Sequence, residues 1–166
     1  MLLSEIPDGS KVFIDSNIFI YHLAKFEKFA DSCLAFFQRV ETGSISSYTS
    51  TLVLAEVLHR LMIIEACNKL NLPPKKLLDH LKTNPKKIKL LTDHIDSYAF
   101  IERMGIFFLT VSAREIEQSN SLKREYNLFT NDAINLAVMK SNSLALLASN
   151  DPDFERVDII TLCKPF

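Results

Sequence analysis

KVFIDSNIF, residues 11–19, is the stretch that determines the expected fold. Its residues Val12, Phe13 and Ile14 are β-branched or aromatic and too few for a helix, so they predict a short buried strand. Asp15 then lies at the carboxyl end of that strand. In open α/β sheets this edge binds ligands, because the loops that leave the strands diverge there and open a crevice.

Further apolar runs alternate with helical patterns along the chain. We expect strands at 44–49, 106–110, 144–148 and 158–162, and helices at 17–23, 31–41, 52–61 and beyond, 85–104, 112–126 and 130–140. This alternation predicts an α/β fold, a three-layer α/β/α sandwich with a central, mostly parallel sheet. With 166 residues, 48% of them hydrophobic, the chain is expected to form a single domain, 1–166.

The charge balance restricts how the chain could meet a polyanion. The net charge is −1 and the pI is about 6.4, which excludes a globally basic nucleic-acid binder. A polyanion would have to be met by a local patch or through metal ions. One basic stretch comprises Lys75, Lys76, Lys82, Lys86, Lys87 and Lys89. These lysines could contact phosphates, although a solvated helical face is the more ordinary explanation.

The cysteines and the first residues bear on location. Cys33, Cys67 and Cys163 are odd in number and lack CxxC spacing, which argues against a disulfide framework and a zinc site. A reducing cytoplasm is therefore the expected location. The opening MLLSEIPDGS lacks a basic region followed by a long apolar one, and no run approaches the roughly 18 apolar residues that span a bilayer. We expect a protein that is neither exported nor embedded in a membrane.

Three other acids occupy transitions between elements or buried positions. Asp151 follows the strand at 144–148, Asp132 lies in the first turn of the helix that begins near Thr130 or Asn131, and Glu56 lies within the apolar run LVLAEVLHRL. Each acid also has an ordinary explanation. An acid in a first turn stabilises the helix dipole, and Asp153, like Asn150, is a common turn residue.

Glu56 is the least ordinary of these acids. The residues around it are apolar on nearly every side, which predicts a helix that is buried on most faces. A lone ionised carboxylate there must be paired, protonated or bound to a cation. Arg60 at i+4, or His59, could supply an ordinary ion pair.

If the strands that precede Asp15 and Asp151 are neighbours, their carboxylates meet at one edge of the sheet. Like charges 4 Å apart repel by about 4 kcal/mol per pair at an effective dielectric near 20, and a divalent cation removes that conflict. Hard oxygen ligands favour Mg²⁺ or Mn²⁺ over zinc. We expect Asp15 and Asp132 as direct ligands, with Glu56 and Asp151 completing the site directly or through water. Ser16, Asn17 and Ser149 could orient ligands or water through hydrogen bonds.

In order and spacing these segments resemble the PIN domain, the nuclease fold of VapC-type toxins. The matching segments are FIDSNIF with Asp15, LVLAEVLHR with Glu56, TNDAINLAV with Asp132, and ASNDPDFERV with Asp151 and Asp153. The first four acids match the family's acidic quartet, and Asp153, in the DF pair, matches a possible fifth member. Ser149 stands where threonine is more common, a change that keeps the hydroxyl. The segment 67–105 is longer than a minimal toxin needs, so substrate contacts or a dimer surface are expected to differ there.

The resemblance implies a Mg²⁺- or Mn²⁺-dependent endoribonuclease that cleaves RNA by metal-activated water. It also implies a homodimer and a cognate antitoxin protein as partners. A catalytically quiet PIN-like module that binds RNA or protein is the alternative, against which the intact quartet argues. A phosphomonoesterase of the haloacid dehalogenase type is a third possibility, but that family requires an acid two residues after the first, where this chain has Asn17.

Overall fold

A five-stranded parallel sheet forms the centre of the computed structural model, which describes all 166 residues. The strands are β1 (Lys11–Ile14), β2 (Ser46–Ser50), β3 (Phe107–Leu109), β4 (Leu146–Ala148) and β5 (Thr161–Cys163), in the order β3-β2-β1-β4-β5. Every pair of neighbours is parallel. The predicted strand at 158–162 begins later, because residues 158–160 form a turn.

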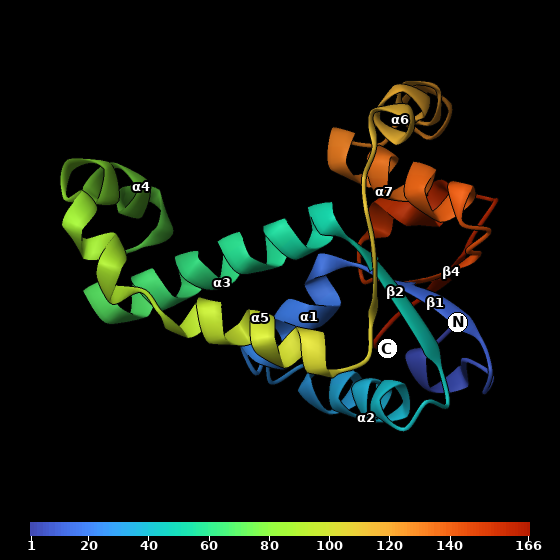
Figure 1. Ribbon diagram of the computed structural model, residues 1–166, viewed down its shortest axis with the longest axis horizontal. Coiled ribbons are helices and arrows are strands. Elements are labelled where there is room, and N and C mark those ends of the chain that lie inside the picture. Colours follow the sequence, from blue (N-terminus) through green and yellow to red (C-terminus); the bar gives the residue numbers. More distant parts are fainter.

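The helices are α1 (Ser16–Leu23), α2 (Ala30–Glu41), α3 (Thr51–Leu70), α4 (Pro74–Thr83), α5 (Asp93–Arg103), α6 (Ala113–Tyr126) and α7 (Thr130–Ser141). Three short 3-10 helices accompany them: η1 (Leu3–Glu5), η2 (Pro85–Leu90) and η3 (Pro152–Arg156). Helices α6 and α7 lie on one side of the sheet and α1 and α2 on the other, so the predicted three-layer α/β/α sandwich is confirmed (Figure 1). No helix is both long and apolar enough to cross a membrane.

The core lies where the predicted buried segments meet. Val12, Phe13 and Ile14 of β1 have no exposed surface, as the sequence predicted for the central strand. Ala133 and Ala137 are also buried, and their small side chains let α7 lie close against the sheet. The central strand and the buried face of α7 thus belong to one hydrophobic core.

Helix α3 extends well beyond the sheet, and α4 lies at its far end (Figure 1). The prediction that α3 is buried on most faces was wrong. Within 52–61, the run on which the prediction rested, the buried residues are Val53, Val57 and Leu61, a single stripe at i, i+4 and i+8. The other residues of 52–61 are half-buried or exposed, because the helix extends beyond the edge of the sheet (Figure 1).

The predicted continuous helix 85–104 was also wrong, since η2 ends at Leu90 and α5 begins at Asp93. Glu65 of α3 causes the break. Its carboxylate accepts hydrogen bonds from the backbone N–H groups of Thr92, Asp93 and His94 at 2.7, 3.1 and 3.2 Å, which gives α5 a separate N-terminus. Burial alone would raise the pKa of Glu65, but these bonds and those from the Lys69 and His94 side chains lower it to about 2.

Candidate functional site

Asp15 is the most tightly held acid at the carboxyl edge of the sheet. It follows β1 directly and serves as N-cap of α1, with Oδ1 accepting from the Ser16 N–H at 2.7 Å. Its Oδ2 accepts from Asn17 Nδ2 at 2.6 Å and from Ser149 Oγ at 2.7 Å. Asn17 and Ser149 therefore orient Asp15 through their side chains, whereas Ser16 does so through its backbone.

Asp151 reaches the same edge because β4 is the neighbour of β1. Ile14 pairs with Ala148, so both strands end at the same level. Ser149 continues β4, and its Oγ accepts from the Asp151 N–H at 3.1 Å. The condition set by the sequence, that the two strands be neighbours, is met.

Glu56 comes to this edge from α3. No Lys, Arg or His forms an ion pair with it, so the ordinary pairing with Arg60 or His59 is absent. The carboxylate is half-buried and faces the same hollow as Arg60. The explanation of Glu56 as one member of a structural ion pair is thus removed.

Asp132 lies in the first turn of α7, whose N-cap is Phe129 and not the expected Thr130 or Asn131. The position of α7 relative to α3 depends on Asn135, whose Oδ1 accepts a hydrogen bond at 2.7 Å from Oγ of Ser50, the N-cap of α3. Asn135 is 3% exposed. Sequence reasoning missed it, although an amide on the apolar face of a helix, three residues after Asp132, was an available signal.

Four acids line a single pocket of about 470 Å³. They are Asp15, Glu56, Asp132 and Asp151, contributed by four different segments. Ser16, Asn17, Tyr21 and Arg60 line it as well. The structure thus brings together the whole quartet that the sequence identified.

The pKa values show how crowded the carboxylates are. Burial, aided by repulsion from Glu56 and Asp151, raises the pKa of Asp15 to about 6 despite its hydrogen bonds to Ser149 and Ser16. Burial and repulsion from Asp15, Asp151 and Glu56 raise the pKa of Asp132 to about 7. An acid present only to stabilise a helix dipole would have a lowered pKa, so that explanation does not account for Asp132.

Asp153 differs from the other acids. Its Oδ1 forms an ion pair with Arg156 at 2.9 Å, and its backbone N–H donates to Asp151 Oδ1 at 2.8 Å. It does not line the pocket. Its contacts are those of a residue that shapes the turn following β4.

The donor set suits a hard divalent cation, but the side chains do not form a closed cage. No three side chains of His, Cys, Asp and Glu are arranged so that they could hold one ion between them. Mg²⁺ retains several waters and is commonly bound by one or two carboxylates, so it does not require such a cage. Two carboxylates with raised pKa values in a pocket of four acids fit an ion of this kind.

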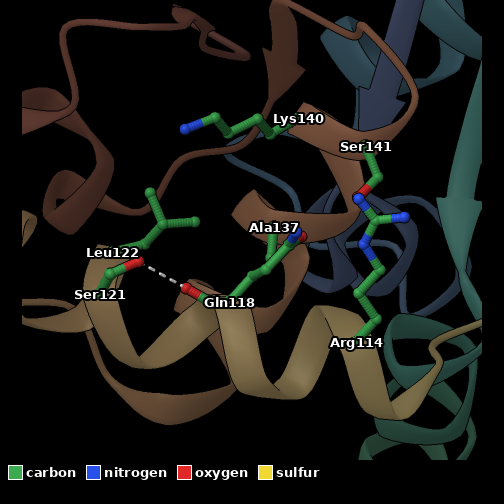
Figure 2. Close-up of a pocket in the computed structure, with 7 residues that line it drawn as sticks. All are labelled: Arg114, Gln118, Ser121, Leu122, Ala137, Lys140 and Ser141. Atoms are coloured by element: carbon green, nitrogen blue, oxygen red, sulfur yellow. Dashed lines mark hydrogen bonds between the residues drawn. The ribbon is translucent and has the colours of Figure 1, made fainter.

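A second hollow, of about 300 Å³, lies between α6 and α7. Figure 2 shows the Arg114 side chain reaching from α6 towards Ser141, while Lys140 extends away from it. Its lining contains no acid, thiol or imidazole. This hollow therefore lacks the reactive groups that the pocket of four acids brings together.

Comparisons with known proteins identify the family of the chain. A family model for the PIN domain matches residues 12–160. The chain is 29% identical over 159 residues to a protein named Ribonuclease VapC2 from Methanocaldococcus jannaschii, covering 95% of each. The solved structure of Mycobacterium tuberculosis VapC20, described as a sarcin-ricin loop cleaving toxin, superposes with a TM-score of 0.62 at 14% identity, covering 89% of this chain and 95% of that one.

A structure of VapBC2 from Rickettsia felis, bound to a DNA fragment from its promoter, superposes with a TM-score of 0.60 at 17% identity. That comparison covers 93% of this chain and 98% of the other. These two structures share the fold of the chain, and the family match, which ends just before β5, contains all four acids. The chain belongs to the PIN domain family.

Proposed function

We propose that this protein is a Mg²⁺- or Mn²⁺-dependent endoribonuclease that hydrolyses RNA phosphodiester bonds at the pocket of four acids. The observation that carries the proposal is the convergence of Asp15, Glu56, Asp132 and Asp151, without a basic partner for Glu56 and with raised pKa values at Asp15 and Asp132. Crowded carboxylates of this kind favour a bound cation over an empty pocket. The relative named Ribonuclease VapC2 supports RNA as the substrate.

Each side chain of the pocket has a different role in the proposed metal site, which follows from its surroundings. Asp15 and Asp132 would hold the metal directly, and Glu56 and Asp151 would complete the site directly or through water. A bound Mg²⁺ or Mn²⁺ supplies a water of lowered pKa and neutralises charge on the phosphate. Asn17 and Ser149 hold Oδ2 of Asp15 in place by hydrogen bonds, so that carboxylate needs little reorganisation when substrate arrives.

We further propose that the protein is the toxin of a type II toxin–antitoxin pair, acting in the cytoplasm as a homodimer of single-domain chains, 1–166. Solved structures with this fold include VapBC assemblies from Rickettsia felis and Salmonella typhimurium and a toxin–antitoxin complex from Klebsiella pneumoniae. A small protein encoded by the adjacent gene is the expected partner. Co-expression with that protein should yield a complex without ribonuclease activity.

The experiment is RNA cleavage in Mg²⁺, in Mn²⁺ and in EDTA, by wild type and by Asp15→Asn and Asp132→Asn. We expect cleavage that requires metal and falls at least about 100-fold in both variants, because each removes a charge from the proposed metal ligands. Asp79→Asn, an exposed acid on α4, is the matched control and should cleave like wild type. Unchanged cleavage in both variants would exclude this site. RNA binding that is equally strong in EDTA, without turnover, would instead favour a catalytically quiet module.

A further inference from the structure

The pocket of four acids continues into an apolar region that the proposed chemistry does not use. We call this region the apolar arm; it consists of Ile20, Tyr21, Phe26, Ile63, Ile64 and Pro74. Glu56, Arg60, Ile63 and Ile64 share one face of α3, at i, i+4, i+7 and i+8. Since α3 rises about 1.5 Å per residue, Ile63 lies about 10 Å along the helix from Glu56.

The apolar arm has an aromatic wall on the side of α1. The rings of Tyr21 and Phe29 stack with centroids 4.5 Å apart, and Phe26 lies 5.6 Å from Tyr21. Phe26 is 52% exposed, although it is among the largest apolar side chains of the pocket. An exposed aromatic ring beside a half-buried one offers a flat apolar surface to a ligand.

A chain of hydrogen bonds connects this wall to the acids. Asn17 donates to Asp15, and its Oδ1 accepts from the Asn150 N–H at 3.1 Å. Asn150 Nδ2 in turn donates to Tyr21 Oη at 3.3 Å. The aromatic wall and the carboxylates therefore keep a fixed relation to each other.

Basic side chains that form no ion pair lie on the same two helices, α3 and α4, as part of the apolar arm. Arg60 stands on α3 between Glu56 and Ile63 and forms no ion pair, although it lines the pocket. Lys75 and Lys76 follow Pro74 in the first turn of α4, are exposed, and form none either. Along α3 the pocket thus presents an acid, then a cation, then apolar surface, and the two lysines lie beyond it on α4.

We propose that the apolar arm binds one unpaired base of an RNA strand, stacked against Phe26, while Arg60 pairs with a phosphate of that nucleotide. This inference rests on the proposed function, which places the scissile phosphate at the acids. A ligand that fits the apolar arm and its basic side chains carries regularly spaced negative charges, with a flat aromatic group between neighbouring charges. An apolar peptide side chain would fill the arm but leave Arg60 without an anion.

The substrate class follows from this arrangement. A base can lie against an aromatic side chain only if it is unstacked from its neighbours, which occurs in single strands, loops and bulges. Cleavage is therefore sensitive to the nucleotide beside the cleaved bond, because its base must be free to enter the apolar arm. Base pairing of that nucleotide within a duplex therefore abolishes cleavage.

The test combines Phe26→Ala with abasic RNA. A fluorescent single-stranded RNA that wild type cleaves at one site is prepared in versions that each lack one base near that site. Phe26→Ala should raise KM about 10-fold, within the range for loss of one base–aromatic stack, with kcat changed less than about twofold. At one position, loss of the base should raise the KM of wild type about as much as Phe26→Ala raises it with intact RNA. Loss of that same base should not raise the KM of Phe26→Ala any further.

Two controls separate the apolar arm from general surface effects. Ile116→Ala removes an apolar side chain that is 50% exposed on α6, outside the pocket, and should leave KM unchanged for every RNA. Arg60→Gln should raise KM and lower the salt dependence of binding by about one phosphate contact, whereas Arg124→Gln on α6 should do neither. Circular dichroism establishes that each variant is folded.

Binding of the same RNAs to the Asp132→Asn protein, measured by fluorescence anisotropy, keeps the test independent of turnover. If cleavage is unchanged in Asp15→Asn and Asp132→Asn but one missing base still weakens binding in EDTA, the proposed function of the acids fails and the base site stands. If Phe26→Ala changes neither KM nor affinity, or if its effect adds to that of every missing base, the base site is wrong. A variant that loses only a protein partner would identify the apolar arm as a protein-docking surface and also overturn the inference.

Discussion

Replacement of Asp15 by asparagine should change how the stability of the metal-free protein depends on pH. Asp15 is 7% exposed, and burial raises its pKa from 3.8 to about 6. A carboxyl group with a higher pKa in the folded chain contributes stability that is fully present below the unfolded value and is lost as the pH rises through the folded one. For Asp15 that loss falls between about pH 4 and pH 6 and amounts to about 3 kcal/mol.

The substitution also has a cost that does not depend on pH. An asparagine keeps the contact with the Ser16 N–H but brings an amide donor against the side-chain donor of Asn17. Loss of one buried hydrogen bond costs about 1 to 2 kcal/mol. Because this cost is nearly the same at each pH, the effect of Asp15→Asn on the free energy of unfolding should become more favourable by about 2 kcal/mol between about pH 4.5 and pH 8.

The measurement is urea denaturation in EDTA, followed by circular dichroism, at about pH 4.5, 6 and 8. The exposed-acid variant Asp79→Asn should show the same effect at each pH, within about 0.5 kcal/mol. An effect of Asp15→Asn that is equally constant would refute the reasoning, because Asp15 would then titrate like an exposed acid. Addition of Mg²⁺ should stabilise wild type more than Asp15→Asn, since only wild type retains the full set of proposed ligands.

Three further predictions concern neighbouring groups. Ser149→Ala removes the hydroxyl that contacts Asp15 and Asp151, so the free energy of unfolding, measured by urea denaturation, should fall by about 1 to 2 kcal/mol. The acid limb of the pH–rate profile should move to higher pH, because the lost hydrogen bond lowers the pKa of Asp15. Ser149→Thr should restore both properties. Asp153→Asn should keep more than about a tenth of wild-type cleavage, because this acid pairs with Arg156 outside the pocket; a loss as large as that of Asp132→Asn would make it a ligand. Glu65→Gln should lower the free energy of unfolding by about 3 kcal/mol near neutral pH, because the carboxylate accepts hydrogen bonds from the first N–H groups of α5. Amide hydrogen exchange should therefore become faster in α5 before it does so in the sheet. The contribution of Glu65 is present above its ordinary pKa of 4.5 and should disappear as the pH falls towards 2. Uniform exchange across the protein would contradict this local role.

The local pattern of apolar and polar residues was sufficient to predict most of the helices and strands. Val12 to Ile14 are apolar on both faces of a short segment, which only a strand between two layers of helices satisfies, and they are fully buried. The helix 85–104 was mispredicted because a carboxylate distant in sequence, Glu65, interrupts it. Burial of α3 was overestimated because composition does not reveal where a helix leaves its sheet.

The sequence by itself determined the α/β fold, the family resemblance and the identity of the acids, since strand ends and first helical turns are local features read from adjacent residues. Only the tertiary structure decided that β4 lies beside β1, that Glu56 lacks a basic partner, and that Asp153 pairs with Arg156. The neighbouring position of β1 and β4, the contact of Ser149 with Asp15 and the raised pKa of Asp15 arise between segments that are distant in the sequence. No local propensity encodes such contacts, because they exist only once the whole core has packed.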